Sequence, residues 1–223
     1  MDLTCAIKKR RTIRKFSKKK VDHSTITKLI ESAIYAPSAC NMQAWKFIII
    51  ESSRKMDKMI ALGTAKWIKN APLGILVIYR NDVTINGKLY KDHYQSSAAA
   101  IQNILLEATN LGLGACWICD LPRPKYIRAI FNIPKQFDII AYIALGYPCD
   151  DNSNLSLIHY GNKSDFQNHT RKYNISQVIN YNSFKKQDSD CTFLPAKKYL
   201  LLKHIFLKRK SPFGTFYTDH MLK

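Results

Sequence analysis

The sequence predicts a layered fold in which helices cover a central β-sheet, of either the α/β or the α+β class. Residues 46–51 contain a β-branched run, 73–79 and 139–145 are apolar runs of strand length, and segments with helical periodicity separate the three. The run 73–79 is apolar at nearly every position, as is typical of a strand buried on both faces. Strands that alternate with helices in this way place a sheet between helical layers.

Helices are expected before and between these strands. A short helix at 2–9 ends at a cluster of arginines, and Ser24 is the expected N-cap of a second helix, which stops before Pro37. Gly112 is the expected stop of a long helix. That long helix is expected at 93–111, and two further helices are expected at 54–62 and 124–131. A short strand is expected at 115–118.

Length and composition fit one domain, or one domain with an extension, because the 223 residues are 46% hydrophobic. No segment reaches the length of a membrane-spanning helix, and the first residues lack a secretory pattern, so we expect a cytoplasmic protein. The formal net charge of +19 would attract polyanions. Because the lysines are spread along the whole chain, we expect no specific nucleic-acid partner.

The six cysteines are scattered, and the sequence shows neither a phosphate-binding P-loop nor a zinc-protease pattern. Cys116 and Cys119 have the spacing of a C-x-x-C motif. A redox or zinc site with this motif would also need a helix start beside it or a second cysteine pair, and the sequence has neither. We interpret them as reduced thiols on a buried strand and at its exit. No metal site is predicted, and the histidines are interpreted as structural or surface residues.

A cluster of cations near residue 10 predicts an anion clamp. Arg10, Arg11 and Arg14 lie within five positions together with the hydroxyl of Thr12. Guanidinium groups bind phosphate oxygens through paired N–H donors, and a hydroxyl adds a neutral donor. Taken alone, such a cluster would more simply be a solvated basic turn.

A second patch precedes the first strand and changes that interpretation. It joins the turn formers Pro37 and Ser38 to the amides of Asn41 and Gln43, just ahead of Trp45. Amide side chains beside an aromatic residue suit the polar edge of a planar heterocycle. Together the two patches predict a site for the phosphate and the ring of a flavin.

These patches resemble the N-terminal signature of the FMN-dependent nitroreductase family. That signature reads roughly R-R-S-x-R-x-F/Y and then A-P-S-x-x-N-x-Q-P-W, with Thr12 and Ala44 standing here for its serine and second proline. Three later segments are similar to the family's central helix, exit strand and closing strand: 102–108, 111–117 and 145–148. The resemblance covers about 6–148, with a fainter echo near Arg171.

The resemblance implies an FMN site shared by two subunits. Its phosphate would meet the first patch and the late Arg171, while Arg14 would stabilise charge on the pyrimidine side of the ring. The second patch would come from the partner subunit, and the exit of the strand at 115–118 would lie alongside the ring. The resulting cofactor-binding candidates are Arg10, Arg11, Thr12, Arg14, Pro37, Ser38, Asn41, Gln43, Lys66, Trp117, Ile118, Cys119 and Arg171.

The resemblance further implies an α+β, three-layer sandwich with a central, mostly antiparallel sheet flanked by helices, in an intertwined homodimer. Small side chains at 96–100 suit close helix approach at such a dimer interface. The FMN-binding domain would span 1–182, with a divergent loop at 148–168. A basic extension at 183–223 is more simply explained by packing on its own dimer than by contact with a membrane surface.

The activity that the resemblance implies is ping-pong hydride transfer. NADH or NADPH would reduce the flavin and leave, and a nitroaromatic, quinone or similar electrophile would then be reduced. No catalytic residue is assigned, because the flavin carries the difficult step. Two alternatives stay open: a specialised branch of the fold (dehalogenase, flavin-fragmenting or azoline-oxidising), and a non-catalytic basic binding module.

Overall fold

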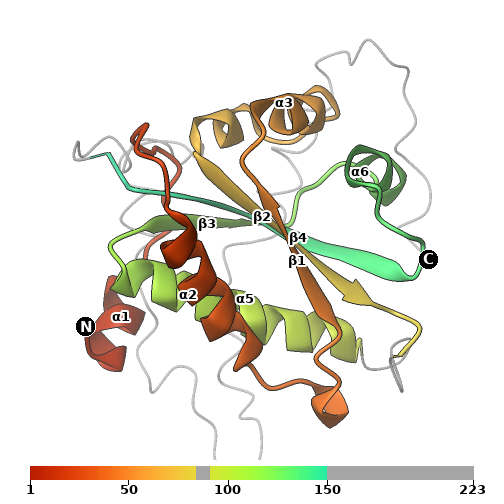
Figure 1. Cartoon of the computed structure of the whole chain (residues 1–223), viewed down its shortest axis with the longest axis horizontal. Coiled ribbons are helices and arrows are strands. Elements are labelled where there is room, and N and C mark those ends of the chain that lie inside the picture. Colours follow the sequence, from red (N-terminus) through yellow and green to blue (C-terminus); the bar gives the residue numbers. More distant parts are fainter. Residues whose placement is uncertain (84–90, 150–223) are drawn as a thin grey trace, which may run out of the picture. The chain divides into compact units, whose positions relative to one another are not determined.

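Four antiparallel strands form the sheet that organises the chain (Figure 1). The computed structural model describes residues 1–83 and 91–149. The strands lie in the order β1-β2-β4-β3, with bounds β1 Trp45–Ile50, β2 Leu73–Arg80, β3 Gly114–Ile118 and β4 Phe137–Gly146. All three neighbouring pairs are antiparallel, which confirms the expected α+β class. The domain boundary expected at 182, Arg171, the extension at 183–223 and all but the first two residues of the loop expected at 148–168 lie outside the described residues.

Helices cover both faces of this sheet (Figure 1). One face carries α2 (His23–Ile34) and α5 (Asp92–Asn110), and α1 (Leu3–Lys9) packs beside α5. The other face carries α3 (Ser53–Ala61), η2 (Lys66–Asn70) and α6 (Pro124–Phe131). The expected three-layer arrangement is therefore confirmed.

Strand β2 shows why the core has two halves. Its alternating side chains point to opposite faces, so Ile75 and Val77 join the cluster under α2 and α5, whereas Leu76 and Ile78 join the cluster under α3 and α6. All four are buried. The near-continuous apolar run predicted a strand buried on both faces, and the structure confirms it. Within the described ranges 1–83 and 91–149, no helix is long and apolar enough to cross a membrane.

The long helix α5 ends as predicted, because Gly112 adopts a left-handed φ of 73° just after its last turn. The expected N-cap of α2 is wrong: the cap is Asp22 and not Ser24. One carboxylate oxygen of Asp22 accepts the backbone N–H of Thr25 at 2.8 Å. The Ser24 hydroxyl instead donates to Asp22 at 2.7 Å. A charged acceptor here also interacts favourably with the positive end of the helix dipole.

Replacing Asp22 by alanine tests this cap. Hydrogen bonds from Ser24 and Thr25 hold the pKa of the Asp22 carboxyl well below its usual range. A depressed folded pKa means that the stabilisation is complete above the unfolded pKa of about 4 and is lost as the pH falls below it. The Asp22→Ala variant should therefore unfold at a lower temperature than the wild type at pH 7. That difference should shrink at pH 3, as followed by circular dichroism; an unchanged difference would contradict the assignment.

Candidate functional site

The arginine-bearing segment 10–17 crosses one end of the sheet. Its first part meets the outer edge of β3, where the backbone N–H of Ile13 donates to the carbonyl of Ala115 at 3.0 Å. Its last part meets the residues that follow β4, where the N–H of Ser17 donates to the carbonyl of Tyr147 at 2.8 Å. Backbone pairing at both ends thus fixes the segment to β3 and β4.

Two glycines make room for this segment. Gly114 and Gly146 lie opposite each other in the β3–β4 register. A Cβ atom at Gly114 would lie 2.7 Å from Ile13, and one at Gly146 would lie 2.6 Å from Pro72 and 3.1 Å from Phe16. Because real Cβ atoms do not approach so closely, larger residues at either position would push neighbouring groups away. The close approach of the arginine segment therefore depends on this glycine pair.

Within the part of the chain that the structure describes, the guanidinium groups of the segment have no carboxylate partner. Arg10 is half-buried and Arg11 is exposed, and one nitrogen of Arg11 donates to the carbonyl of Arg10 at 2.9 Å. Arg14 lies over the ring of Trp67 in η2, 5.9 Å from its centroid. Among residues 1–83 and 91–149, none of the three arginines forms an ion pair. Such an uncompensated cluster fits the donor set that a phosphate requires.

Two further residues, the candidate Lys66 and the buried Cys116, belong to the elements that neighbour Arg14. Lys66 begins η2 and directly precedes Trp67. Cys116, on β3, is near enough for the charge of Arg14 to favour its thiolate, yet burial raises the pKa of the Cys116 thiol to about 11. This thiol therefore stays protonated at neutral pH and is not a nucleophile. Both interpretations of the C-x-x-C hold: Cys116 is buried and free, and Cys119 is exposed and free just past the strand.

Strand β3 offers backbone groups as well as side chains. As an edge strand of the sheet, it presents N–H and C=O groups along its outer side beyond Ala115. Ile118 packs with the cluster under α3 and α6, and Trp117 packs with the opposite cluster. The indole N–H of Trp117 is buried and has no hydrogen-bond partner within the described residues. Buried donors in folded proteins usually have an acceptor, so the unpaired indole N–H is consistent with an acceptor on a bound ligand beside β3.

The second patch forms a tight loop around the 3-10 helix η1 (Ala39–Asn41), which the sequence did not predict. Three non-glycine residues there have left-handed φ values: Cys40 at 49°, Asn41 at 55° and Gln43 at 48°. Each costs roughly 1 kcal/mol. Internal hydrogen bonds offset part of that strain, since Ser38 Oγ accepts the N–H of Gln43 at 3.0 Å and the Gln43 amide donates to Asn41 at 2.9 Å.

One chain does not bring the two patches together. The second patch leads into β1, one edge of the sheet, at the end where Tyr79 pairs with Asp138. The arginine segment attaches to β3, the other edge, at the end where Leu73 pairs with Leu145. At about 3.3 Å per residue and about 4.8 Å per strand, these sites are roughly 20 Å apart along β4 and roughly 14 Å across the sheet. In Figure 1, η1 lies at the foot of β1, far from β3.

Comparisons with known proteins assign the chain to a family. The model of the nitroreductase family matches residues 7–63 and 57–147. A protein of Methanothermobacter thermautotrophicus, provisionally named NADH dehydrogenase/NAD(P)H nitroreductase, is 34% identical over 155 residues, covering 68% of this chain and 80% of that protein. The chain therefore belongs to the nitroreductase family, as the sequence predicted.

Two further relatives bear on the function. The solved structure of an FMN-dependent nitroreductase from Clostridium difficile R20291 is 25% identical, with a TM-score of 0.63, covering 81% of this chain and 99% of that one. A 5,6-dimethylbenzimidazole synthase of Rhodospirillum rubrum is 24% identical over 170 residues, covering 64% of this chain and 80% of that protein.

Proposed function

We propose that this protein is an FMN-dependent oxidoreductase that uses NADH or NADPH to reduce nitroaromatic, quinone or similar electrophilic acceptors. The observation that carries the proposal is the uncompensated arginine segment fixed across the edge of β3. A set of guanidinium groups held by backbone pairing, with no carboxylate partner among the described residues, is a preorganised site for a dianionic phosphate.

Each part of the segment takes a distinct role in this proposal. Arg10 and Arg11 bind the phosphate, with the exposed hydroxyl of Thr12 as an additional donor. Arg14 is kept apart from them by its stacking on Trp67. There its charge favours the electron-rich, reduced form of a flavin ring. When bound, FMN supplies the hydride-accepting and electron-donating chemistry. Lys66 and Arg171, the latter outside the described residues, stay predicted contributors of positive charge.

The exit of β3 and the η1 loop supply the polar groups that contact the flavin ring in this proposal. The edge of β3 at Trp117 and Ile118 supplies backbone donors and acceptors for the polar side of the ring. The loop with Ser38, Asn41 and Gln43 supplies amide groups. Because these two sites are far apart within one chain, the loop that meets a given flavin comes from a second subunit. Pro37, exposed at the start of the loop, limits the backbone angles there.

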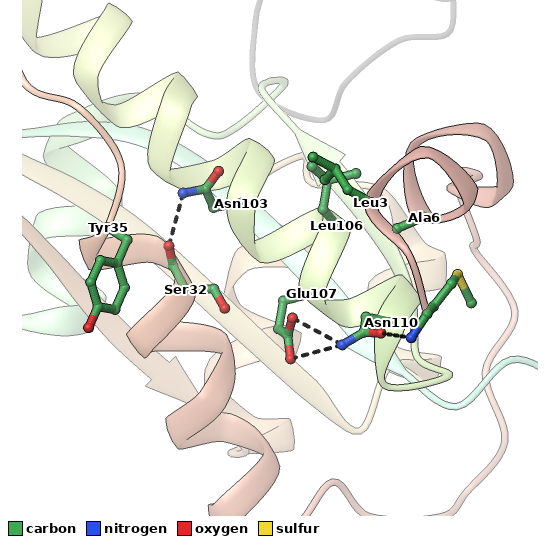
Figure 2. A pocket seen from close by; sticks show the side chains of 9 residues that line it. Leu3, Ala6, Ser32, Tyr35, Asn103, Leu106, Glu107 and Asn110 are labelled. Carbon is green, nitrogen blue, oxygen red and sulfur yellow. Dashed lines mark hydrogen bonds between the residues drawn. The ribbon is translucent and has the colours of Figure 1, made fainter.

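An exposed apolar surface on α1, α2 and α5 supports the homodimer in this proposal. Leu3 and Tyr35 are 68% and 85% exposed, and Ile7 and Ile34 are 53% and 47% exposed. A hollow of about 390 Å³ lies among these helices, and Figure 2 shows the side chains that line it. Large apolar side chains left in solvent indicate a protein interface. The residues that line the hollow are Met1, Leu3, Ala6, Ser32, Tyr35, Asn103, Leu106, Glu107 and Asn110.

The relative from Rhodospirillum rubrum favours a second candidate function, a flavin-fragmenting enzyme. Its name denotes a synthase of 5,6-dimethylbenzimidazole, and that compound contains the dimethylated benzene ring that also ends the flavin ring system. The two candidates differ in the fate of the cofactor. Mass spectrometry after incubation of the FMN-loaded protein with a reductant and oxygen would detect 5,6-dimethylbenzimidazole for the second candidate and intact FMN for the first.

An absorbance spectrum tests the proposed activity directly. The purified, FMN-reconstituted protein should show flavin bands near about 450 nm that bleach when NADH or NADPH is added without oxygen. The bands should return when a quinone or nitroaromatic compound is added. A protein that never retains FMN would contradict the proposal and favour a binding module. Bands that persist with both nucleotides would exclude them as electron donors.

The double variant Arg10→Ala/Arg11→Ala tests the phosphate assignment. Loss of two charge-assisted contacts should weaken FMN binding roughly a hundredfold or more, so that the purified protein is colourless. The helical signal should stay unchanged, because the segment is held by its backbone. The matched control is Lys18→Ala/Lys20→Ala, which removes the same charge from two exposed residues nearby. Full FMN occupancy in the arginine variant, or equal losses in both, would show that the phosphate lies elsewhere.

A further inference from the structure

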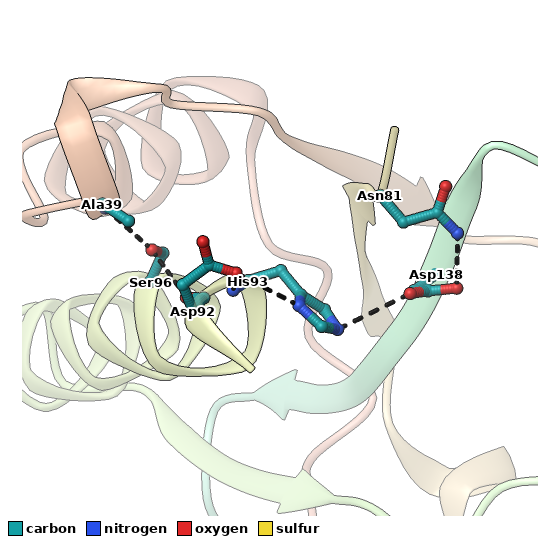
Figure 3. Close-up of polar contacts among 6 residues, drawn as sticks. All are labelled: Ala39, Asn81, Asp92, His93, Ser96 and Asp138. Carbon is teal, nitrogen blue, oxygen red and sulfur yellow. Dashed lines mark hydrogen bonds and ion pairs between the residues drawn. The ribbon is translucent and has the colours of Figure 1, made fainter. Parts of the chain in front are cut away.

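A polar chain connects the η1 loop to the first turn of α5 (Figure 3). The backbone N–H of Ala39 donates to Oγ of Ser96 at 3.2 Å. The Ser96 hydroxyl donates in turn to the carbonyl of Asp92 at 2.9 Å. Ser96 is only 4% exposed, and both of these hydrogen bonds are partly buried. Its hydroxyl therefore acts as donor and acceptor at once, between a loop and a helix that are distant in sequence.

The loop needs such an external attachment because its backbone is strained. Three left-handed, non-glycine residues stand within four positions, at Cys40, Asn41 and Gln43. Conformations of this kind persist only where the surrounding structure holds them. The internal hydrogen bonds around Ser38 and Gln43 close the loop on itself. They do not set where the loop stands against the rest of the fold, whereas the bond to Ser96 does.

The turn that carries Ser96 is itself fixed to the sheet (Figure 3). Imidazole Nε2 of the buried His93 lies 3.6 Å from a carboxylate oxygen of Asp138 on β4, and its Nδ1 lies 3.5 Å from Asp92. The other oxygen of Asp138 accepts the Asn81 amide at 2.9 Å. The preceding residue, Lys91, has a left-handed φ and gives the helix no side-chain cap. The Asp92 carboxylate accepts the backbone N–H of His93 at 2.8 Å, and the His93 ring contacts Asp138, so these two residues help to place the start of α5.

We propose that Ser96 is a positioning residue for the flavin ring: it fixes the η1 loop, and His93 fixes the helical turn from which Ser96 acts. The inference rests on the proposed function, because it assigns the η1 loop to the ring side of FMN. Neither Ser96 nor His93 touches the flavin in this arrangement. Their effect is on the orientation of the amide groups of Asn41 and Gln43.

Ser96→Ala in the full-length chain is the test, and Ser97→Ala is its matched control. Ser97 is the next residue on α5, is fully buried, and its hydroxyl has no partner within the described residues. Removing the Ser96 hydroxyl takes away the acceptor of the partly buried N–H of Ala39. FMN and riboflavin should both bind roughly tenfold more weakly to Ser96→Ala, and the visible band of the bound flavin should shift. Ser97→Ala should leave both affinities and the band unchanged.

The comparison of the two flavins separates positioning from phosphate binding. A loss at the ring reduces the affinity for FMN and riboflavin by the same factor, whereas loss of Arg10 and Arg11, which meet the phosphate, affects FMN alone. Amide hydrogen exchange at Ala39, measured without flavin, should become on the order of tenfold faster in Ser96→Ala and not in Ser97→Ala. His93→Leu should reproduce the losses of Ser96→Ala, and His93→Gln, which keeps an N–H donor, should restore part of them.

The outcomes are distinguishable. Wild-type affinity and an unshifted band in Ser96→Ala overturn this inference while the proposed function stands. Equal losses in Ser96→Ala and Ser97→Ala also overturn it, because they indicate a general effect of packing. A wild-type protein that binds neither FMN nor riboflavin overturns the proposed function and this inference together.

Discussion

The register of β4 is the constraint on which the remainder of the structure depends. This strand pairs with β2 on one side and β3 on the other, and each pairing is antiparallel. Its first residues face the end of β2, next to the η1 loop, and its last residues meet the arginine segment. Because side chains alternate along a strand, a shift by one residue would turn the β4 side chains in each apolar cluster to the opposite face and displace the strands next to both patches. The separation of the patches therefore follows from the same pairing that builds the core.

Each patch is held by features that look unrelated to binding. The arginine segment lies close to the sheet because Gly114 and Gly146 carry no side chains at the crossing. The η1 loop keeps a strained backbone with the help of Ser96, whose hydroxyl oxygen accepts a hydrogen bond from the N–H of Ala39. In the arginine segment, backbone contacts fix the chain and leave the guanidinium groups without an ion pair among the described residues. In the η1 loop, side-chain hydrogen bonds of Ser38, Asn41 and Gln43 fix the loop in advance. Preorganisation of this kind reduces the entropy lost when a ligand binds.

The motifs around Arg10 and Asn41 predicted the family through a resemblance. The strands were predicted to within two residues at each end, because apolar period and length are local signals. The N-cap of α2 was missed because Asp22 and Ser24 are both good capping residues and stand two positions apart. The stacking of Arg14 on Trp67 and the bond from Ala39 to Ser96 join residues more than fifty positions apart. No local pattern encodes such contacts, so Ser96, His93 and Trp67 became visible only in the folded chain.

The central claim is that one flavin is shared by two chains, and a mixed dimer tests it most directly. One chain carries Arg10→Ala/Arg11→Ala, and the other carries Asn41→Gly/Gln43→Gly, which keeps the left-handed backbone accessible. The two chains are co-expressed with different tags, and the mixed dimer is purified. Each variant alone should be colourless, while the mixed dimer should bind one FMN per dimer, because one of its two sites has both patches intact. A mixed dimer as colourless as its parents would show that a single chain supplies both patches.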